Sequence, residues 1–399
     1  MSLPTMTDEG SHPVPVGTRR LDGSLLFVVN SAEFFLSHRL ALALAAATAG
    51  LDVAVATPAG SGVDEIVNLG FPHHPIAMTR RGTKLWQEAM SVWQLGKLFH
   101  RIRPDIIHAV TIKPVLYGGI AARMVGGSAV VSAITGLGEV FIARGVGAQM
   151  RRYGVMRAYR VALGHSASRV IFQNPDDRAQ FVERRLVAPA RTVLIRGSGV
   201  DMESFPITPE PDGVPVVMLA GRMLWSKGVA EFIAAARHLR AQGFSARFVL
   251  VGDTDPGNPQ AIPTSVLAKW QQEGVIDWWG FRQDMAMVLA AAHIVVLPSY
   301  YGEGVPKVLI EGAALGRALV ATDAPGCREI VHNERGGLLV PVKDVAALET
   351  ALVRLIKDTP LRRTFGAYAA QLARAEFSVE RVISDTFDLY ASLLGGDRR

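Results

Sequence analysis

The chain contains a single cysteine, Cys327, and no run of eighteen uncharged apolar residues. One cysteine excludes a disulfide within the chain and fits a reducing compartment. Because such an apolar run is missing, we expect no transmembrane helix. The first twenty residues are polar and contain proline and glycine, without the apolar segment of a signal peptide. We therefore expect residues 1–23 to form a flexible leader.

Three sequence signatures are also missing. The first apolar strand, Ser24–Asn30, is followed by Asn30-Ser31-Ala32 and not by G-x-G-x-x-G, which disfavours a nicotinamide dehydrogenase. We find neither a nucleic-acid-binding motif nor interleaved stacking aromatics, so no nucleic-acid partner is expected. The one metal-like triplet, Asp253-Thr254-Asp255, opens a loop rich in Gly, Pro and Asn, and we interpret it as a turn. No metal and no cofactor are expected.

Acidic residues are scarce in part of the first half. Residues 1–210 hold 22 basic and 16 acidic residues, whereas residues 211–399 hold 20 of each, so the net charge of +6 comes from the first half. No acid occurs between Val140 and Pro175, a stretch with five arginines: Arg144, Arg151, Arg152, Arg157 and Arg160. This patch suits an anionic membrane surface or a lipid-linked diphosphate. A solvated helix face is the alternative.

The order of the elements predicts an α/β protein. Apolar strands alternate with helices from Ser24 onward, with a first helix at about Phe34–Ala49, which indicates a doubly wound domain. A chain of 399 residues is long enough for two such domains. We predict five segments: the leader at 1–23, a first domain at 24–206, a Pro-rich linker at 207–215, a second domain at 216–375, and a helix at 376–399 that crosses back to the first domain.

The stretch Pro298–Glu329 has the clearest chemical pattern. Glu303 lies in a Gly-rich loop just before a helix that starts near Pro306, and Glu311 lies inside that apolar helix. A buried carboxylate needs a partner, and the helix N-terminus favours a phosphate. A sugar ring and a diphosphate satisfy both features. The alternative is an amphipathic helix with one solvated glutamate.

A pair of basic residues follows the first strand of the second domain. Arg222 ends the strand, and Lys227 precedes a helix five residues later. Arginine grips phosphate oxygens in a bidentate manner, while lysine acts as a mobile point charge. The pair predicts a clamp for a diphosphate, with a structural salt pair as the alternative.

The segment EGVPKVLIEGAALGRALVATDAPGCREIV resembles the two-glutamate signature of retaining GT-B glycosyltransferases of family 4, group 1. The resemblance extends from Leu25 to Leu394. FFLSHRLALALAAATAGLDVAVAT and VGDTDPGNPQAI resemble the branch that builds bacterial surface polysaccharide and lipid-linked oligosaccharide. The resemblance implies the GT-B fold, in which two Rossmann-like domains face each other across a cleft. The first domain would be the acceptor side, and the second would bind the nucleotide sugar.

The resemblance also implies residue roles. Glu303 would contact the donor sugar, Glu311 the ribose, and Arg222 with Lys227 the diphosphate; these make Glu303, Arg222 and Lys227 the catalytic candidates. Further donor-binding candidates are Gly304, Val305, Gly280, Arg282 and Gly221. The acceptor-side candidates are His38, His108, Lys113, Thr135 and Gly136. His108 as a buried core histidine stays open, and the histidine that many family members place near Thr135 is absent.

The predicted function follows from these features together. We predict a retaining hexosyltransferase that moves a sugar, UDP-linked hexose or N-acetylhexosamine, to a polyprenyl-diphosphate-linked glycan. It would work in the cytoplasm, in peripheral contact with the anionic inner face of the plasma membrane. Two alternatives remain: a nucleotide-sugar 2-epimerase of the same fold, and a non-catalytic subunit that binds sugar nucleotides.

Overall fold

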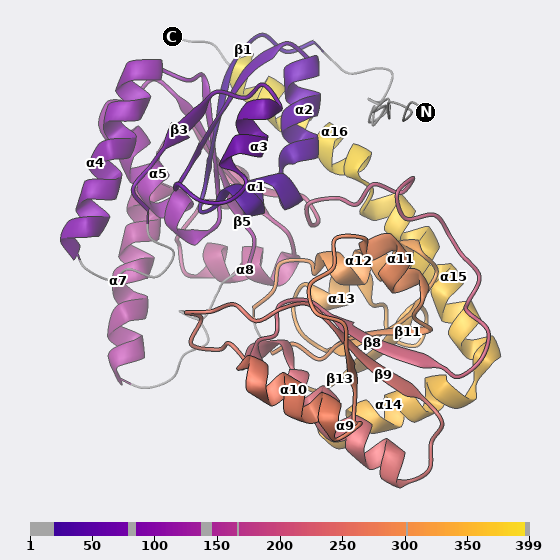
Figure 1. The fold of residues 1–399 in the computed structure, drawn as a ribbon. Coiled ribbons are helices and arrows are strands. Elements are labelled where there is room, and N and C mark those ends of the chain that lie inside the picture. Colours follow the sequence, from indigo (N-terminus) through magenta and orange to yellow (C-terminus); the bar gives the residue numbers. More distant parts are fainter. Residues whose placement is uncertain (1–19, 79–84, 137–145, 166, 301, 396–399) are drawn as a thin grey trace, which may run out of the picture.

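The structure, a computed structural model, describes residues 20–78, 85–136, 146–165, 167–300 and 302–395 (Figure 1). Two parallel β-sheets, each flanked by helices, form the two halves of the molecule. This architecture confirms the predicted doubly wound α/β class. In the part of the chain described here, no helix combines the length and the apolar character needed to cross a membrane.

The first sheet has seven parallel strands in the order β3-β2-β1-β4-β5-β6-β7. Their bounds are β1 Gly23–Val29, β2 Leu51–Thr57, β3 His73–Pro75, β4 Ile106–Val110, β5 Ala129–Ile134, β6 Ser168–Phe172 and β7 Thr192–Leu194. Every residue of the central strand β4 is buried, which explains why all of them except His108 are apolar. The winding direction reverses between β1 and β4, and open α/β sheets bind ligands at such points.

The second sheet has six parallel strands in the order β10-β9-β8-β11-β12-β13. Their bounds are β8 Val216–Ala220, β9 Arg247–Val251, β10 Asp277–Trp278, β11 Ile294–Leu297, β12 Ala318–Thr322 and β13 Gly337–Val340. Here the winding direction reverses between β8 and β11. The loops after these two strands therefore meet at one edge of the sheet.

Helices cover both faces of each sheet (Figure 1). In the first half they are α1 Ala32–His38, α2 Leu40–Thr48, α3 Val63–Asn68, α4 Leu85–Ile102, α5 Ile112–Val125, α7 Val146–Ala162 and α8 Pro175–Glu183. In the second half they are α9 Val229–Ala241, α10 Thr264–Gln272, α11 Met285–Ala290, α12 Lys307–Ala314, α13 Cys327–Ile330, α14 Val345–Lys357 and α15 Thr359–Glu376. The last helix is α16 Val379–Leu394. Short 3-10 turns, Pro189–Arg191 and Trp225–Lys227, precede β7 and α9.

The last helix returns to the first sheet. Figure 1 shows α16, in yellow, running from the second half to the first. Its buried side chains Val382, Phe387 and Tyr390 belong to the same apolar cluster as Phe27 of β1. The two halves are thus tied together by packing as well as by the chain between β7 and β8.

The predicted first helix, Phe34–Ala49, is wrong in one respect because the structure breaks it into α1 and α2 at Arg39. Ser31 caps α1 with its side-chain oxygen, so the helix begins at Ala32. The guanidinium of Arg39 is buried and donates to the carbonyl oxygen of His38, at 2.9 Å. A continuous helix would use that carbonyl for its own hydrogen bond. His38 therefore ends a helix and does not lie near the start of one.

Candidate active site

The site is built where the loops after β8 and β11 meet. Lys227 Nζ lies 2.5 Å from Glu303 Oε1, and Ser299 Oγ donates to the same oxygen at 3.0 Å. The carbonyl oxygen of Ser226 accepts from Ser299 Oγ at 3.2 Å, which fixes one loop on the other. Gly228 permits this approach, because a Cβ atom there would lie 2.1 Å from the carbonyl oxygen of Pro298. Lys227 and Glu303, far apart in sequence, thus form one ion pair.

Loops of the first half contact the loop that carries Glu303. A Cβ atom on Gly136, after β5, would lie 2.3 Å from the carbonyl oxygen of Gly302. Gln173, after β6, accepts the backbone N–H of Val305 on its side-chain oxygen at 3.0 Å. The backbone of Thr135 lies beside Gly304. Thr135, Gly136, Gly304 and Val305 are therefore all at the junction between the two sheets, and Gln173 is a participant that the sequence did not reveal.

Glu311 is buried in α12, and only 7% of its surface is exposed. Burial raises the pKa of this carboxyl group, and the charge of Lys307 one turn earlier opposes the rise. Lys307 Nζ lies 3.6 Å from Glu311 Oε1 and donates to the carbonyl oxygen of Ser37 at 3.1 Å. Lys307 therefore links the buried carboxylate to the end of α1 in the first half. The sequence placed Lys307 next to the motif but gave no sign of this link.

Arg222 extends from the end of β8 with about half of its side chain exposed, and Nη1 lies 2.8 Å from Asp255 Oδ2. Its charge also reaches His38. Burial, followed by the charges of Lys307, Arg39 and Arg222, lowers the pKa of His38 to about 3. His38, Lys307 and Arg222 thus share one positively charged region between the halves, and at pH 7 the imidazole is neutral.

The remaining donor-side candidates lie at the same edge of the second sheet. Gly221 follows β8 with a φ of 150°, and Gly280 follows β10 with its carbonyl oxygen accepting from the N–H of Gly252 at 2.7 Å. Arg282 pairs with Asp284, two residues further along. These backbone positions surround the carboxyl ends of β8, β9 and β10.

Two acceptor-side candidates do not join this site. His108 is buried in β4, stacks on Phe27 and has Nδ1 2.5 Å from the hydroxyl of Tyr390, so the structure shows the core histidine of the two alternatives. Burial against apolar neighbours and the charge of Arg39 lower its pKa. Lys113 Nζ lies 2.8 Å from Glu88 Oε1 of α4, which turns the lysine toward that helix.

The Asp253-Thr254-Asp255 triplet forms a turn. Asp253 Oδ1 accepts a hydrogen bond from the backbone N–H of Thr254 at 2.8 Å. The carbonyl oxygen of Asp255 accepts one from the backbone N–H of Asn258 at 2.9 Å. The Asp255 carboxylate pairs with Arg222. Among the described residues, no three His, Cys, Asp or Glu side chains are grouped so that they could hold a metal ion. Cys327 is buried, and its pKa is raised to about 12 by burial and by the nearby charge of Glu303.

Comparison with known families matches both halves of the chain. Residues 24–174 match the model described as glycosyl transferase 4-like, and residues 214–358 match the model described as glycosyl transferases group 1. The chain is a glycosyltransferase, with a glycosyl transferase 4-like segment followed by a group 1 segment. The two matched segments contain the first and second sheets, respectively, and the second includes Arg222, Lys227, Glu303 and Glu311.

Two curated relatives of this glycosyltransferase act on lipid-linked sugars by their names. The N,N'-diacetylbacillosaminyl-diphospho-undecaprenol alpha-1,3-N-acetylgalactosaminyltransferase of Campylobacter jejuni is 27% identical, over 80% of this chain and 86% of its own length. The UDP-Gal:alpha-D-GlcNAc-diphosphoundecaprenol alpha-1,3-galactosyltransferase of Escherichia coli is 26% identical, over 70% and 74%.

Solved structures confirm the GT-B fold of the enzyme. Sucrose-phosphate synthase of Thermosynechococcus elongatus superposes with a TM-score of 0.78 at 21% identity, covering 94% of this chain and all of the other. HepE of Anabaena, solved with UDP and glucose, gives a TM-score of 0.73 at 21% identity, covering 93% of this chain and all of that one.

Proposed function

We propose that this glycosyltransferase moves a sugar from a nucleotide diphosphate donor, a UDP-linked hexose or N-acetylhexosamine, to a polyprenyl-diphosphate-linked glycan, with retention at the anomeric carbon. The observation that carries the proposal is the Lys227–Glu303 ion pair, placed with the buried Glu311 at the junction of the two sheets. The names of the two curated relatives support a lipid-linked acceptor.

When the donor binds, its diphosphate and sugar replace the contacts that the charged side chains of the site make with one another. Lys227 turns from Glu303 to the diphosphate, and Arg222, half exposed beside Asp255, joins it as the second cation. Glu303 then accepts from the sugar hydroxyls. Glu311, held in the first turns of α12 by Lys307, accepts from the ribose. Gly304, Val305 and the backbone around Gly221, Gly280 and Arg282 complete the donor side.

The transfer step needs no nucleophile from the protein. The bond between the anomeric carbon and the diphosphate oxygen breaks, and the acceptor hydroxyl oxygen forms a new bond to that carbon on the same face. The hydroxyl proton passes to an oxygen of the departing diphosphate. Lys227 and Arg222 offset the negative charge that grows on this leaving group, which is the kind of stabilisation that usually contributes most to catalysis.

On the first half, His38, Thr135 and Gly136 lie at the junction and are the acceptor-side residues of this proposal. We further propose that the enzyme contacts the anionic inner surface of the plasma membrane through the arginine patch. Arg151, Arg152, Arg157 and Arg160 lie on α7, whereas Arg144 lies outside the described residues. Binding to anionic vesicles should weaken with added salt and in the triple variant Arg151→Gln, Arg152→Gln, Arg157→Gln.

The test is transfer of radiolabelled sugar from a panel of nucleotide sugars to a polyprenyl-diphosphate-linked glycan, after a thermal-shift screen has chosen the donor. We expect label in the lipid fraction, with the anomeric configuration of the donor preserved. Formation of a 2-epimer without acceptor would show the epimerase alternative instead. A nucleotide sugar that binds but is never turned over would show the non-catalytic one.

A further inference from the structure

Helix α4 presents large apolar side chains to solvent. Trp86 is 65% exposed, Trp93 52% and Met90 42%. With Lys97 they follow one another at spacings of four, three and four residues, so they lie on one face over roughly 16 Å of helix. A continuous exposed stripe with two tryptophans is unusual on a soluble surface and marks an interaction site.

Core packing accounts for the opposite face of α4 and not for this stripe. Leu95, Leu98 and Phe99 are buried in a cluster with Leu26 and Val28 of β1. The helix is therefore fixed on the sheet by its inner face. Neither Trp86 nor Trp93 belongs to that cluster.

The charge beside the stripe has one sign. Lys97 Nζ lies 3.8 Å from the centre of the Trp93 ring, and Arg101 follows one turn later on the exposed side. The single acidic residue of α4, Glu88, points inward, where its carboxylate accepts from Lys113 and from the hydroxyl of Tyr117. The outward face of α4 is thus aromatic and cationic, which is complementary to an anionic apolar boundary.

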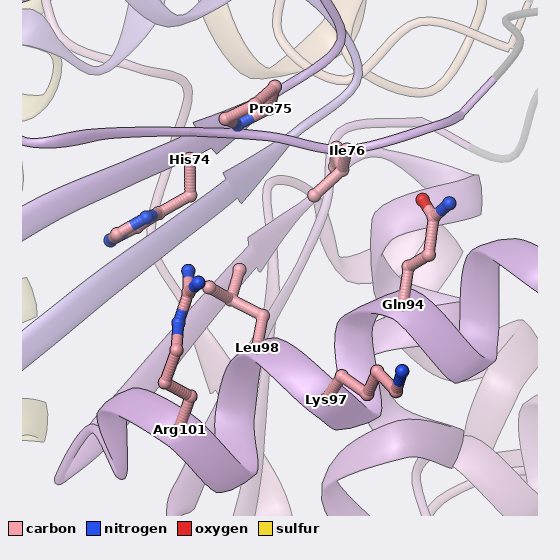
Figure 2. Close-up of a pocket in the computed structure, with 7 residues that line it drawn as sticks. All are labelled: His74, Pro75, Ile76, Gln94, Lys97, Leu98 and Arg101. Carbon is pink, nitrogen blue, oxygen red and sulfur yellow. The ribbon is translucent and has the colours of Figure 1, made fainter.

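A cavity of about 510 Å³ adjoins this face, between β3 and α4 (Figure 2). Its polar lining consists of Lys97, Arg101, Gln94 and His74, and no carboxylate is among its described lining residues. In Figure 2 the guanidinium of Arg101 reaches toward His74. Burial and the charge of Arg101 lower the pKa of His74, so a neutral imidazole stands beside two cations. This combination suits a phosphate group.

The stripe starts near the active-site edge. Lys113, which pairs with Glu88 in the first turn of α4, lies in the first turn of α5, directly after the carboxyl end of β4. That edge of the sheet faces the second half (Figure 1). Helices α4, α5 and α7 pack one beside the next, so α4 and α7 cover the same face of the first sheet.

We propose that α4 docks the enzyme on an anionic phospholipid bilayer, with Trp86, Met90 and Trp93 entering the interface and Lys97 with Arg101 holding a lipid phosphate at the adjoining cavity. Tryptophan is enriched at membrane interfaces, and amphipathic helices lie in the interfacial plane. The inference rests on the proposed function for its purpose, because docking here would bring the cleft to a lipid-linked acceptor. It adds the surface and the lipid chemistry.

The experiment is flotation of the full chain with vesicles of phosphatidylcholine, with and without phosphatidylglycerol. We expect Trp86→Ser with Trp93→Ser, and separately Lys97→Gln with Arg101→Gln, to weaken binding to anionic vesicles about tenfold. Two matched controls in the second half, Met287→Ser on α11 and Arg240→Gln with Lys269→Gln, should bind as the wild type does. Brominated lipids should quench tryptophan fluorescence in the wild type and much less in Trp86→Phe with Trp93→Phe.

Transfer to a short-chain, water-soluble acceptor separates this inference from the proposed function. The α4 variants should retain that transfer, which also shows that they are folded. Vesicle binding by the α4 variants equal to that of the wild type would overturn the docking surface while leaving the transfer reaction intact. Conversion of a dimer to a monomer by the tryptophan changes, with vesicle binding unaltered, would overturn it in favour of a second copy of this chain. Absence of transfer to any acceptor would instead contradict the proposed function.

Discussion

The two halves of the enzyme handle the charges at their strand ends differently. In the second half, Lys227 pairs with Glu303 and Arg222 pairs with Asp255, all at the edge where the loops after the strands meet. In the first half, Lys113 pairs with Glu88 on α4, and His108 is buried beneath α16. A charged residue after a strand therefore indicates a site only where its partner also comes from a loop after a strand; the partner of Lys113 instead belongs to helix α4.

The comparison also explains why the second half was easier to interpret. Its candidate site comes largely from one continuous segment, Pro298–Glu329, whose loop and helix bring Glu303 and Glu311 to the same edge. The facing side of the first half is assembled from separate segments, namely the end of α1 at Ser37 and the loops at Gly136 and Gln173. Only the fold brings these three together.

The largest effect is expected at the clamp. Lys227→Ala should lower the transfer rate about 10²–10³-fold, because one charged contact to the leaving diphosphate is lost. Arg222→Ala, at a half-exposed position, should lower it less. The measurement is the rate constant at saturating donor, with circular dichroism to show that both variants are folded. Near-normal turnover in both would contradict the assignment.

A smaller effect is expected at Lys307. Lys307→Met removes the ion pair of the buried Glu311, so the pKa of that carboxyl group should rise further and fewer molecules should carry the carboxylate. We expect KM for the donor to rise about tenfold, with a larger rise at pH 6 than at pH 8. Lys357→Met, on α14 over Phe244, is the control for a lost lysine. A KM that does not depend on pH in the Lys307 variant would argue against this link.

Substitution of His108 in the core and of His38 at the junction between the halves should have different effects. His108→Gln should lower the free energy of unfolding by about 1–3 kcal/mol, since a buried partner of Tyr390 is lost, while KM is retained. His38→Gln should change kinetics with little change in stability.

The pH dependence provides a second test of His108. Its pKa is lower in the folded state than in the unfolded chain, so its contribution to stability is complete above about pH 6.5 and is lost as the pH falls. Thermal unfolding between pH 7 and pH 5 should therefore depend less on pH in His108→Gln than in the wild type. An unchanged slope would place the titrating group elsewhere.

The smallest effect is expected from removal of metal ions. The described residues contain no cluster that could hold a metal, and Asp253–Asp255 is a turn that engages Arg222. EDTA should leave the transfer rate nearly unchanged. Complete loss of activity that added metal restores would show that the triplet had been misinterpreted.

Much of the fold follows from local sequence. The strand predicted at Ser24–Asn30 is β1 at Gly23–Val29, and the helix predicted to start near Pro306 is α12, because apolar patterns and turn residues determine both. The break at Arg39 could not be predicted, since it depends on burial of one guanidinium. The edge strand β3 was also missed, because three residues are too few to show a pattern.

The site was predictable to a similar extent. Glu303, Glu311 and Lys227 follow from residue type and spacing within short segments. Lys307 and Gln173 could not be identified, because their contacts cross between the halves and local sequence does not show which residues of the two halves meet. Histidine occurs both in protein cores and in binding sites, so the residue type alone could not assign His108. Its contact with Tyr390 of α16 identifies it as a core residue.

Titration with UDP tests the central claim most directly, namely that the edge of the second half binds the donor diphosphate while the strand-end charges of the first half do not. The variants are Lys227→Ala and, as the matched lysine of the first half, Lys113→Met. We predict that Kd for UDP rises about tenfold or more in Lys227→Ala and stays at the wild-type value in Lys113→Met. Wild-type affinity in Lys227→Ala, or a loss confined to Lys113→Met, would contradict the account.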